Sequence, residues 1–110
     1  MTVDTNPDTS HPIELVRRGD VDDDAVEYAM KRLDAVMEHV GAPILFVRVR
    51  LSHDATQPRP RPALAQATLD INGDLLRAHV AADTITEATD MLADRLRDQI
   101  QHRAERRRAR

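Results

Sequence analysis

The side chains with the clearest capacity for binding chemistry are arginines that alternate with apolar residues. Arg48 and Arg50 stand in V-R-V-R-L, and Arg77 stands with His79 in L-R-A-H-V. Because alternation puts every second side chain on the same face of a strand, these residues are expected to share one polar face. A planar guanidinium pairs well with phosphate oxygens. The sequence therefore predicts a phosphate-contacting surface, which would also include Gln66 and Thr68 and be flanked by Arg59 and Arg61.

A second group of basic residues lies toward the C-terminus. The first forty residues hold ten acidic and four basic side chains, whereas the remaining seventy hold nine and twelve. Fifteen of the sixteen basic residues are arginine. For both groups the alternative is structural: Asp70 and Asp74 would partly neutralise the polar face, and cations near a helix C-terminus stabilise the helix dipole. The candidate phosphate-contacting residues of this second group are Arg95, Arg97, Arg103, Arg106 and Arg107.

Patterns for catalysis or metal binding are weak in this chain. Ser52, His53 and Asp54 are consecutive, so in or beside a strand they point to alternating faces and do not form a catalytic triad. The five histidines lack metal-ligand spacing and the chain has no cysteine. The run Asp22–Asp24 suits a helix N-terminus better than a cation site. We expect no enzyme activity, no cofactor, no metal and no small-molecule substrate.

Length and composition predict one domain of modest size. The chain has 110 residues and a formal net charge of −3. No apolar run approaches the roughly 20 residues of a membrane span, and no secretory signal is recognisable at the start, so a cytoplasmic protein is expected. Residues 1–12 are polar and contain proline, which predicts a disordered tail. Residues 13–100 are expected to form the domain, and residues 101–110 an Arg-rich helical extension or tail.

The first half of the domain is predicted to contain a strand, a helix and a second strand. Ile13–Arg17 is the first strand. A helix follows Asp22–Asp24, one of which serves as its N-cap, and Gly41 and Pro43 end it. Ile44–Ser52 is the second strand. The side chains expected to face the core from the helix and this strand are Val26, Met30, Leu33, Met37, Val40, Leu45, Val47, Val49 and Leu51.

The second half is predicted to contain a hairpin and a long helix. His53–Pro62 holds three prolines and should form an extended, polyproline-like loop. Ala63–Ala82 alternates apolar and polar residues around Asn72-Gly73, the pair that favours a tight hairpin turn. Thr84 and Glu87 have the spacing of a capping box at the start of a helix. The apolar face of that helix comprises Ile85, Ala88, Leu92, Leu96 and Ile100.

The element order is therefore β-α-β-β-β-α. One face of the sheet is apolar and the other polar, so both helices must cover the same face. The expected fold class is α+β, a two-layer sandwich with a four-stranded sheet and both helices on one side.

The chain resembles the ribosome hibernation-promoting factors, also called ribosome-associated inhibitor or ribosomal subunit interface proteins. The resemblance covers residues 13 to about 100. Within the family, the chain is most similar to the short, divergent actinobacterial members. The resemblance rests on V-R-V-R-L at 47–51, A-Q-A-T-L-D-I-N-G at 65–73 and L-R-A-H-V-A-A-D-T-I-T-E-A-T-D-M-L at 76–92. It implies a fold related to double-stranded-RNA-binding domains.

The resemblance also implies a function. A member of this family would bind the 30S ribosomal subunit through 16S rRNA, occupy the channel of mRNA and tRNA, and inhibit translation without chemistry. Positions that match the family's RNA-contacting residues in kind are Arg77, Arg95 and Arg97. Typical members have a more basic first helix. Long members also carry a second domain that pairs ribosomes, to which nothing here corresponds, so action on single ribosomes or with another protein is expected.

The sequence leaves two other hypotheses open. The chain could be a non-enzymatic, stress-related protein-interaction module that forms a homodimer through its sheet face or a strand edge; its acidic first helix favours this alternative. It could also be a general RNA binder that acts through the C-terminal arginines alone. No membrane partner is expected.

Overall fold

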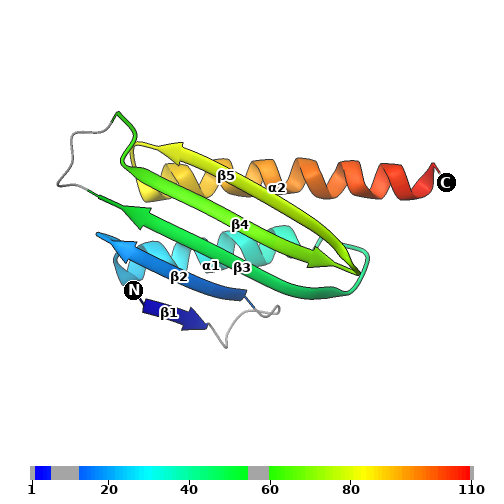
Figure 1. Cartoon of the computed structure of the whole chain (residues 1–110), viewed down its shortest axis with the longest axis horizontal. Helices are drawn as coiled ribbons and strands as arrows, with labels where there is room; N and C mark the ends of the chain where they lie inside the picture. Colours follow the sequence, from blue (N-terminus) through cyan, green and yellow to red (C-terminus); the bar gives the residue numbers. More distant parts are fainter. Residues whose placement is uncertain (1, 6–12, 55–59, 110) are drawn as a thin grey trace.

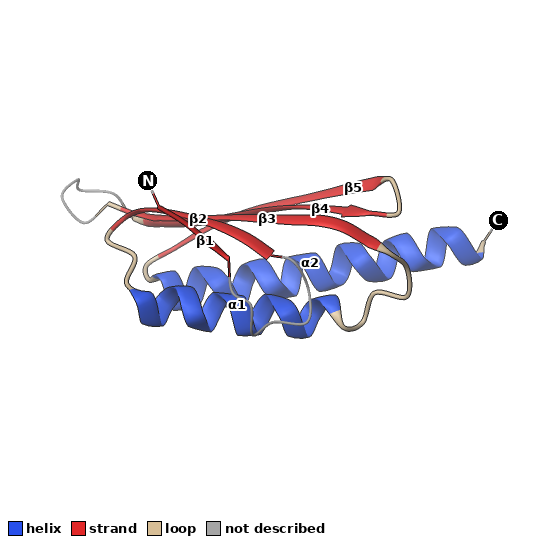
Figure 2. Cartoon of the chain, turned by 90° about the horizontal axis from the view of Figure 1, so that it is seen from below, coloured by secondary structure: helices blue, strands red, loops and turns tan. Residues whose placement is uncertain are grey.

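The computed structural model describes residues 2–5, 13–54 and 60–109. Its elements follow the order β1 (Thr2–Thr5), β2 (Ile13–Gly19), α1 (Asp23–Met37), β3 (Ile44–His53), β4 (Ala63–Ile71), β5 (Asp74–Ala82) and α2 (Ile85–Arg108). The five strands form one sheet in the order β1-β2-β3-β4-β5, and both helices lie against the same face of it (Figures 1 and 2). The predicted β-α-β-β-β-α sandwich is confirmed, with β1 as an additional strand.

The strand β1 was not expected. Residues 1–12 were predicted to be a disordered tail, but Thr2–Thr5 pairs antiparallel with β2, in register from Thr2 opposite Arg17 to Thr5 opposite Glu14. The outer edge of β2 offers unpaired N–H and C=O groups, which a short segment can satisfy whatever its own composition. Residues 6–12 lie outside the described part of the chain. The prediction of a tail is therefore wrong for these four residues.

The sheet contains both parallel and antiparallel strand pairs. The helix α1 crosses between β2 and β3, which are parallel, whereas β3-β4 and β4-β5 are antiparallel. The β4-β5 hairpin turns through Asn72 and Gly73 as predicted, with φ of 51° and 96°. Positive φ at both central residues gives the turn that matches the strand twist.

The caps of both helices agree with the sequence. Asp22 is the N-cap of α1 and its carboxylate accepts a hydrogen bond from Ala25 N at 2.8 Å. Thr84 is the N-cap of α2, and its hydroxyl accepts from Glu87 N at 3.1 Å. Each cap satisfies an N–H group that the helix itself leaves unpaired. The side chains expected on the apolar face of α2 are all buried.

The core lies between the sheet and the helices. Every second residue of β4 and β5 is buried, including Leu69 and Val80, as the alternation predicted. Leu45 is the exception in β3: it was expected to face the core but is 60% exposed. The register of β3 with β4 shifts between Ile44 and Phe46, so Leu45 is the extra residue of a bulge.

Gly19 shows how closely two segments approach at the end of β2. Its φ is +78°, and a Cβ built on it would lie 2.2 Å from the carbonyl oxygen of His53. That oxygen accepts a hydrogen bond from Asp20 N at 2.9 Å. A side chain at position 19 would therefore both strain the backbone and displace the end of β3.

We expect Gly19→Ala to lower the free energy of unfolding by about 2 kcal/mol or more, since left-handed strain and a backbone clash act together. Urea denaturation measures the effect. Gly41→Ala is the matched control, because nothing lies within 4 Å of its Cβ position. Equal stability of the two variants would contradict this interpretation of Gly19.

Candidate nucleic-acid interface

The face of the sheet opposite the helices, here called the open face, carries polar side chains in rows across the strands. Arg48 on β3 is opposite Thr68 on β4, which is opposite Arg77 on β5. The next row along consists of Arg50, Gln66 and His79, in the same strand order. The prediction that these residues share one face is confirmed, because the pairing register and the burial pattern both require it.

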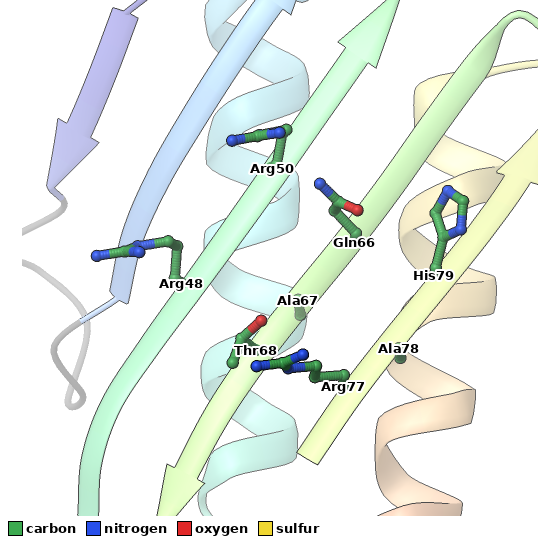
Figure 3. Close-up of a pocket in the computed structure, with 8 residues that line it drawn as sticks. All are labelled: Arg48, Arg50, Gln66, Ala67, Thr68, Arg77, Ala78 and His79. Atoms are coloured by element: carbon green, nitrogen blue, oxygen red, sulfur yellow. The ribbon is translucent and has the colours of Figure 1, made fainter. Parts of the chain in front are cut away.

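The open face is hollowed over these two rows. A shallow cavity of about 480 Å³ is lined by their six polar side chains and by Ala67 and Ala78. In Figure 3, Arg77 extends across β4 toward Thr68, whereas Arg48 extends toward β2. A neighbouring hollow of about 200 Å³ includes Arg50 and His79 and continues to Arg18. Guanidinium groups thus surround a depression that is open to solvent.

Arg18 also lies on the open face, although the sequence did not predict it there. The first strand was expected to end at Arg17, but β2 continues to Gly19 and pairs Arg18 with Ser52. The signal was present in the alternation, because Glu14, Val16 and Arg18 are in phase along the same strand. Extending the strand by two residues would have added Arg18 to the open face.

The two carboxylates expected to neutralise the open face form no ion pair with its arginines in the described part of the chain. Asp70 accepts a hydrogen bond from Gly73 N at 2.8 Å, within the hairpin turn. Asp74 binds two arginines of α2. Among the described residues, the one ion pair to an open-face arginine joins Arg48 Nε and Glu14 Oε1, at 3.7 Å. Most arginines of the open face are therefore left without an ion-pair partner among the described residues.

Two side chains of α2 cover the outer edge of β5. Arg95 Nη1 donates to His79 O at 3.2 Å, and Gln99 Nε2 donates to Arg77 O at 2.7 Å. Carbonyls on an edge strand otherwise remain free to pair with another chain. One guanidinium nitrogen of Arg95 thus binds the backbone of this edge, and the phosphate contact of Arg95 stays a prediction.

The C-terminal arginines do not act as one group. Arg103 is only 8% exposed, and its Nε donates to Asp74 Oδ2 at 2.9 Å while its Nη2 donates to Ile71 O. Arg107 Nη2 binds the same oxygen of Asp74 at 2.6 Å. Arg106 is exposed on α2. Arg103 and Arg107 thus attach α2 to the tip of the hairpin.

These contacts lower the pKa of the Asp74 carboxyl below its usual range, mainly through the hydrogen bond from Arg107 and also through Arg103, against a smaller opposing effect of desolvation. The charged form of Asp74 is therefore favoured in the folded protein.

The outer surface of α1 and of the first half of α2 is acidic, and Lys31, Arg32 and Arg97 on it are paired with carboxylates. Asp90 Oδ1 accepts hydrogen bonds from the Tyr28 hydroxyl at 2.5 Å and from Arg32 Nε at 3.1 Å. The bond from Tyr28 is the main cause of the lowered pKa of Asp90 and of the raised pKa of Tyr28. Two further basic side chains also pair: Lys31 with Glu27 at 2.9 Å, and Arg97 with Asp94 at 3.9 Å.

Comparison with known proteins identifies the family of this chain. Residues 16–108 match the family model described as "Sigma 54 modulation protein / S30EA ribosomal protein". The chain belongs to this family. The resemblance inferred from the sequence is thereby confirmed, while its assignment to the actinobacterial type stays a prediction. No curated protein matches this S30EA-family chain by sequence.

Two solved structures share the fold of this S30EA-family chain. The Thermus thermophilus Protein Y N-terminal domain has a TM-score of 0.62 at 22% identity, over 78% of this chain and 92% of that one. A ribosomal subunit interface protein from Coxiella burnetii has a TM-score of 0.63 at 15% identity, over 83% of this chain and 97% of that one. Both alignments cover nearly the whole of the chain in the other structure.

Among the predicted site residues, the structure brings Arg48, Arg50, Arg77 and His79 together on the open face. Arg61 is exposed at the end of the loop before β4, and Arg59 lies outside the described residues. Neither helix among the described residues has the length and apolar composition of a membrane span. Within the same residues, no cluster of three or more side chains of metal-binding type is present.

The ion pairs of Asp74 predict a pH dependence of stability. A carboxyl whose folded-state pKa is lowered adds stability that is complete above its unfolded pKa of about 3.9 and is lost as the pH falls through the folded value. We expect the Asp74→Asn variant to be less stable than the wild type at pH 7. It should also lose less stability than the wild type as the pH falls below about 4. Denaturant titrations across this pH range measure both effects.

Asp98→Asn, a change at an exposed carboxylate on α2, is the control and should leave the pH dependence as in the wild type. An Asp74→Asn protein with the wild-type profile would contradict a structural role for this carboxylate.

Proposed function

We propose that this protein is a non-enzymatic ribosome-binding factor that holds the small subunit inactive. It binds the 30S subunit through 16S rRNA, occupies the channel used by mRNA and tRNA, and prevents translation by occupancy. Membership of the S30EA ribosomal protein family supports ribosome association. The location that follows is the cytoplasm, where ribosomes are found.

The observation that carries the proposal is the unneutralised positive charge of the open face. Arg18, Arg50 and Arg77 have no carboxylate ion pair in the described structure, and Arg48 has one at the long distance of 3.7 Å. Phosphate contacts through such side chains release counterions and supply a large share of the affinity of proteins for nucleic acids. A shallow, open hollow also suits a polymer backbone better than an enclosed small molecule.

The charge of the helix layer supports the same orientation. Carboxylates are frequent on the outer surfaces of α1 and of the first half of α2, and Lys31, Arg32 and Arg97 are paired with them. This surface would repel phosphate, so the open face is the side we propose for RNA. Arg61, which is exposed, extends the basic surface at its margin. Arg95, Arg103 and Arg107 serve mainly to hold α2 in place.

Homodimer formation is the second candidate. Two large apolar side chains on the open face, Phe46 and Leu75, favour it, since exposed apolar groups often mark protein contacts. A dimer through the β5 edge is disfavoured, because α2 side chains already bind the carbonyls of Arg77 and His79. Light scattering after size exclusion distinguishes the candidates: a stable dimer without ribosome association would support the interaction module.

We expect the protein to pellet with 30S subunits, with a logarithmic salt slope of about −3 for four cationic contacts. The triple change Arg48→Glu, Arg50→Glu and Arg77→Glu should abolish pelleting at moderate salt. The control with the same charge change is Arg97→Glu, Arg106→Glu and Arg108→Glu on α2. It should retain most of the binding.

Circular dichroism checks that both triple variants are folded. Failure of the wild type to pellet even at low salt would overturn the proposed function. If the α2 control lost binding and the open-face variant kept it, the assignment of the surface would be wrong.

A further inference from the structure

An apolar platform adjoins the cationic rows of the open face. Phe46 is 40% exposed and Leu75 is 54% exposed. Phe46 is opposite Asp70 on β4, which is opposite Leu75 on β5, so the three form the row next to Arg48, Thr68 and Arg77. We call Phe46 and Leu75 the apolar platform.

The strand geometry fixes the spacing of the platform. Side chains two residues apart on one strand lie about 7 Å from each other, and strands are about 4.8 Å apart. Phe46 is thus about 7 Å from Arg48 along β3, and Leu75 is about 7 Å from Arg77 along β5. The carboxylate of Asp70, which lies between Phe46 and Leu75, accepts the hydrogen bond from Gly73 N in the turn. On the open face, a row with two apolar side chains therefore lies directly beside a row with two guanidinium groups.

Apolar side chains beside cations are expected to distinguish single-stranded RNA from duplex RNA. The exterior of a duplex presents phosphates and sugars, so an apolar side chain on the contact surface gains little from it. A single strand presents its phosphates together with unstacked bases, and a base packed on an aromatic side chain contributes substantially to affinity. A face with cations alone would favour the duplex, which has the higher charge density, whereas an aromatic and an aliphatic side chain beside the cations favour the single strand.

We propose that the open face binds a single-stranded RNA segment, with an unpaired base on Phe46 and Leu75 and the adjoining phosphates on the cationic rows. The first phosphate lies over Arg48 and Arg77, and the next lies over Arg50 and His79. Gln66 and Thr68, on the central strand between these cations, are placed to hydrogen-bond ribose or phosphate oxygens (Figure 3).

Recognition by this arrangement depends on strandedness more than on sequence. One aromatic ring has room for one base, and every base has a face that can stack on it. The cationic rows contact only the backbone, which is the same for every nucleotide. The inference deepens the proposed function and rests on it: the part of the small subunit covered by the open face would be an unpaired segment of RNA.

The test uses fluorescence anisotropy with three probes: an unstructured RNA octamer, the same strand in a duplex, and an octamer of abasic ribose-phosphate units. We expect the wild type to bind the octamer more tightly than the duplex. The double change Phe46→Ala and Leu75→Ala should weaken octamer binding by roughly 5- to 100-fold. It should leave binding of the abasic probe unchanged. Arg48→Glu with Arg77→Glu should weaken binding of all three probes.

Leu45→Ala is the matched control for the platform. Leu45 is more exposed than Phe46 or Leu75, but it belongs to the bulge and has no register partner on β4. It should bind all three probes as the wild type does. Thermal unfolding checks that each variant is folded, which is expected because all three apolar side chains lie outside the core.

Three results would overturn the inference: equal octamer affinity of the platform variant and the wild type, equal wild-type affinity for octamer and duplex, or a loss in Leu45→Ala as large as that of the platform variant. The 30S pelleting experiment is run in parallel. Pelleting that depends on the arginines but not on the platform would leave the proposed function standing and reject the single-strand site. Loss of wild-type pelleting would instead reject the proposed function itself.

Discussion

One-sided burial of the sheet is the constraint on which the rest of the molecule depends. Because α1 and α2 both lie on the same face, every second residue of β3, β4 and β5 must be apolar (Figure 2). The intervening positions are released from packing and can carry any side chain that tolerates water. A slip of one residue in the register would exchange the two sets, and the turn at Asn72 and Gly73 helps to prevent it. Core and candidate site are thus specified by the same alternation.

The sheet and the helix layer differ in charge because their arginines have different partners. Arginines that α2 directs toward the sheet bind Asp74, a strand carbonyl or both, and Arg32 and Arg97 on the outer helix surface pair with carboxylates. The arginines of β3 and β5 have few such partners. A formal net charge of −3 therefore conceals a strongly asymmetric molecule. Net charge alone would have argued against binding to RNA, whereas the arrangement of the charges favours it.

Features encoded by neighbouring residues were predictable from the sequence. The hairpin turn, both N-caps and the faces of β4 and β5 depend on residues a few positions apart, and all agree with the structure. Features that depend on distant pairing were not. The strand at Thr2–Thr5 exists because β2 has a free edge, and the exposure of Leu45 results from a shift in pairing with β4. Likewise, Asp74 meets Arg103 across 29 positions of sequence, which no local pattern shows.

The same contact has a consequence for motion. In Figure 1 the last turns of α2 extend past the tip of the β4-β5 hairpin, and the ends of long helices are ordinarily the first parts of a protein to open. Arg103 and Arg107 tie this region to Asp74, the residue immediately before Leu75. Helix end and hairpin tip would therefore open together as one cooperative unit, exchanging their amide hydrogens at similar rates. Fraying of the helix, rather than bending of the sheet, would set how long the end of the open face keeps its shape.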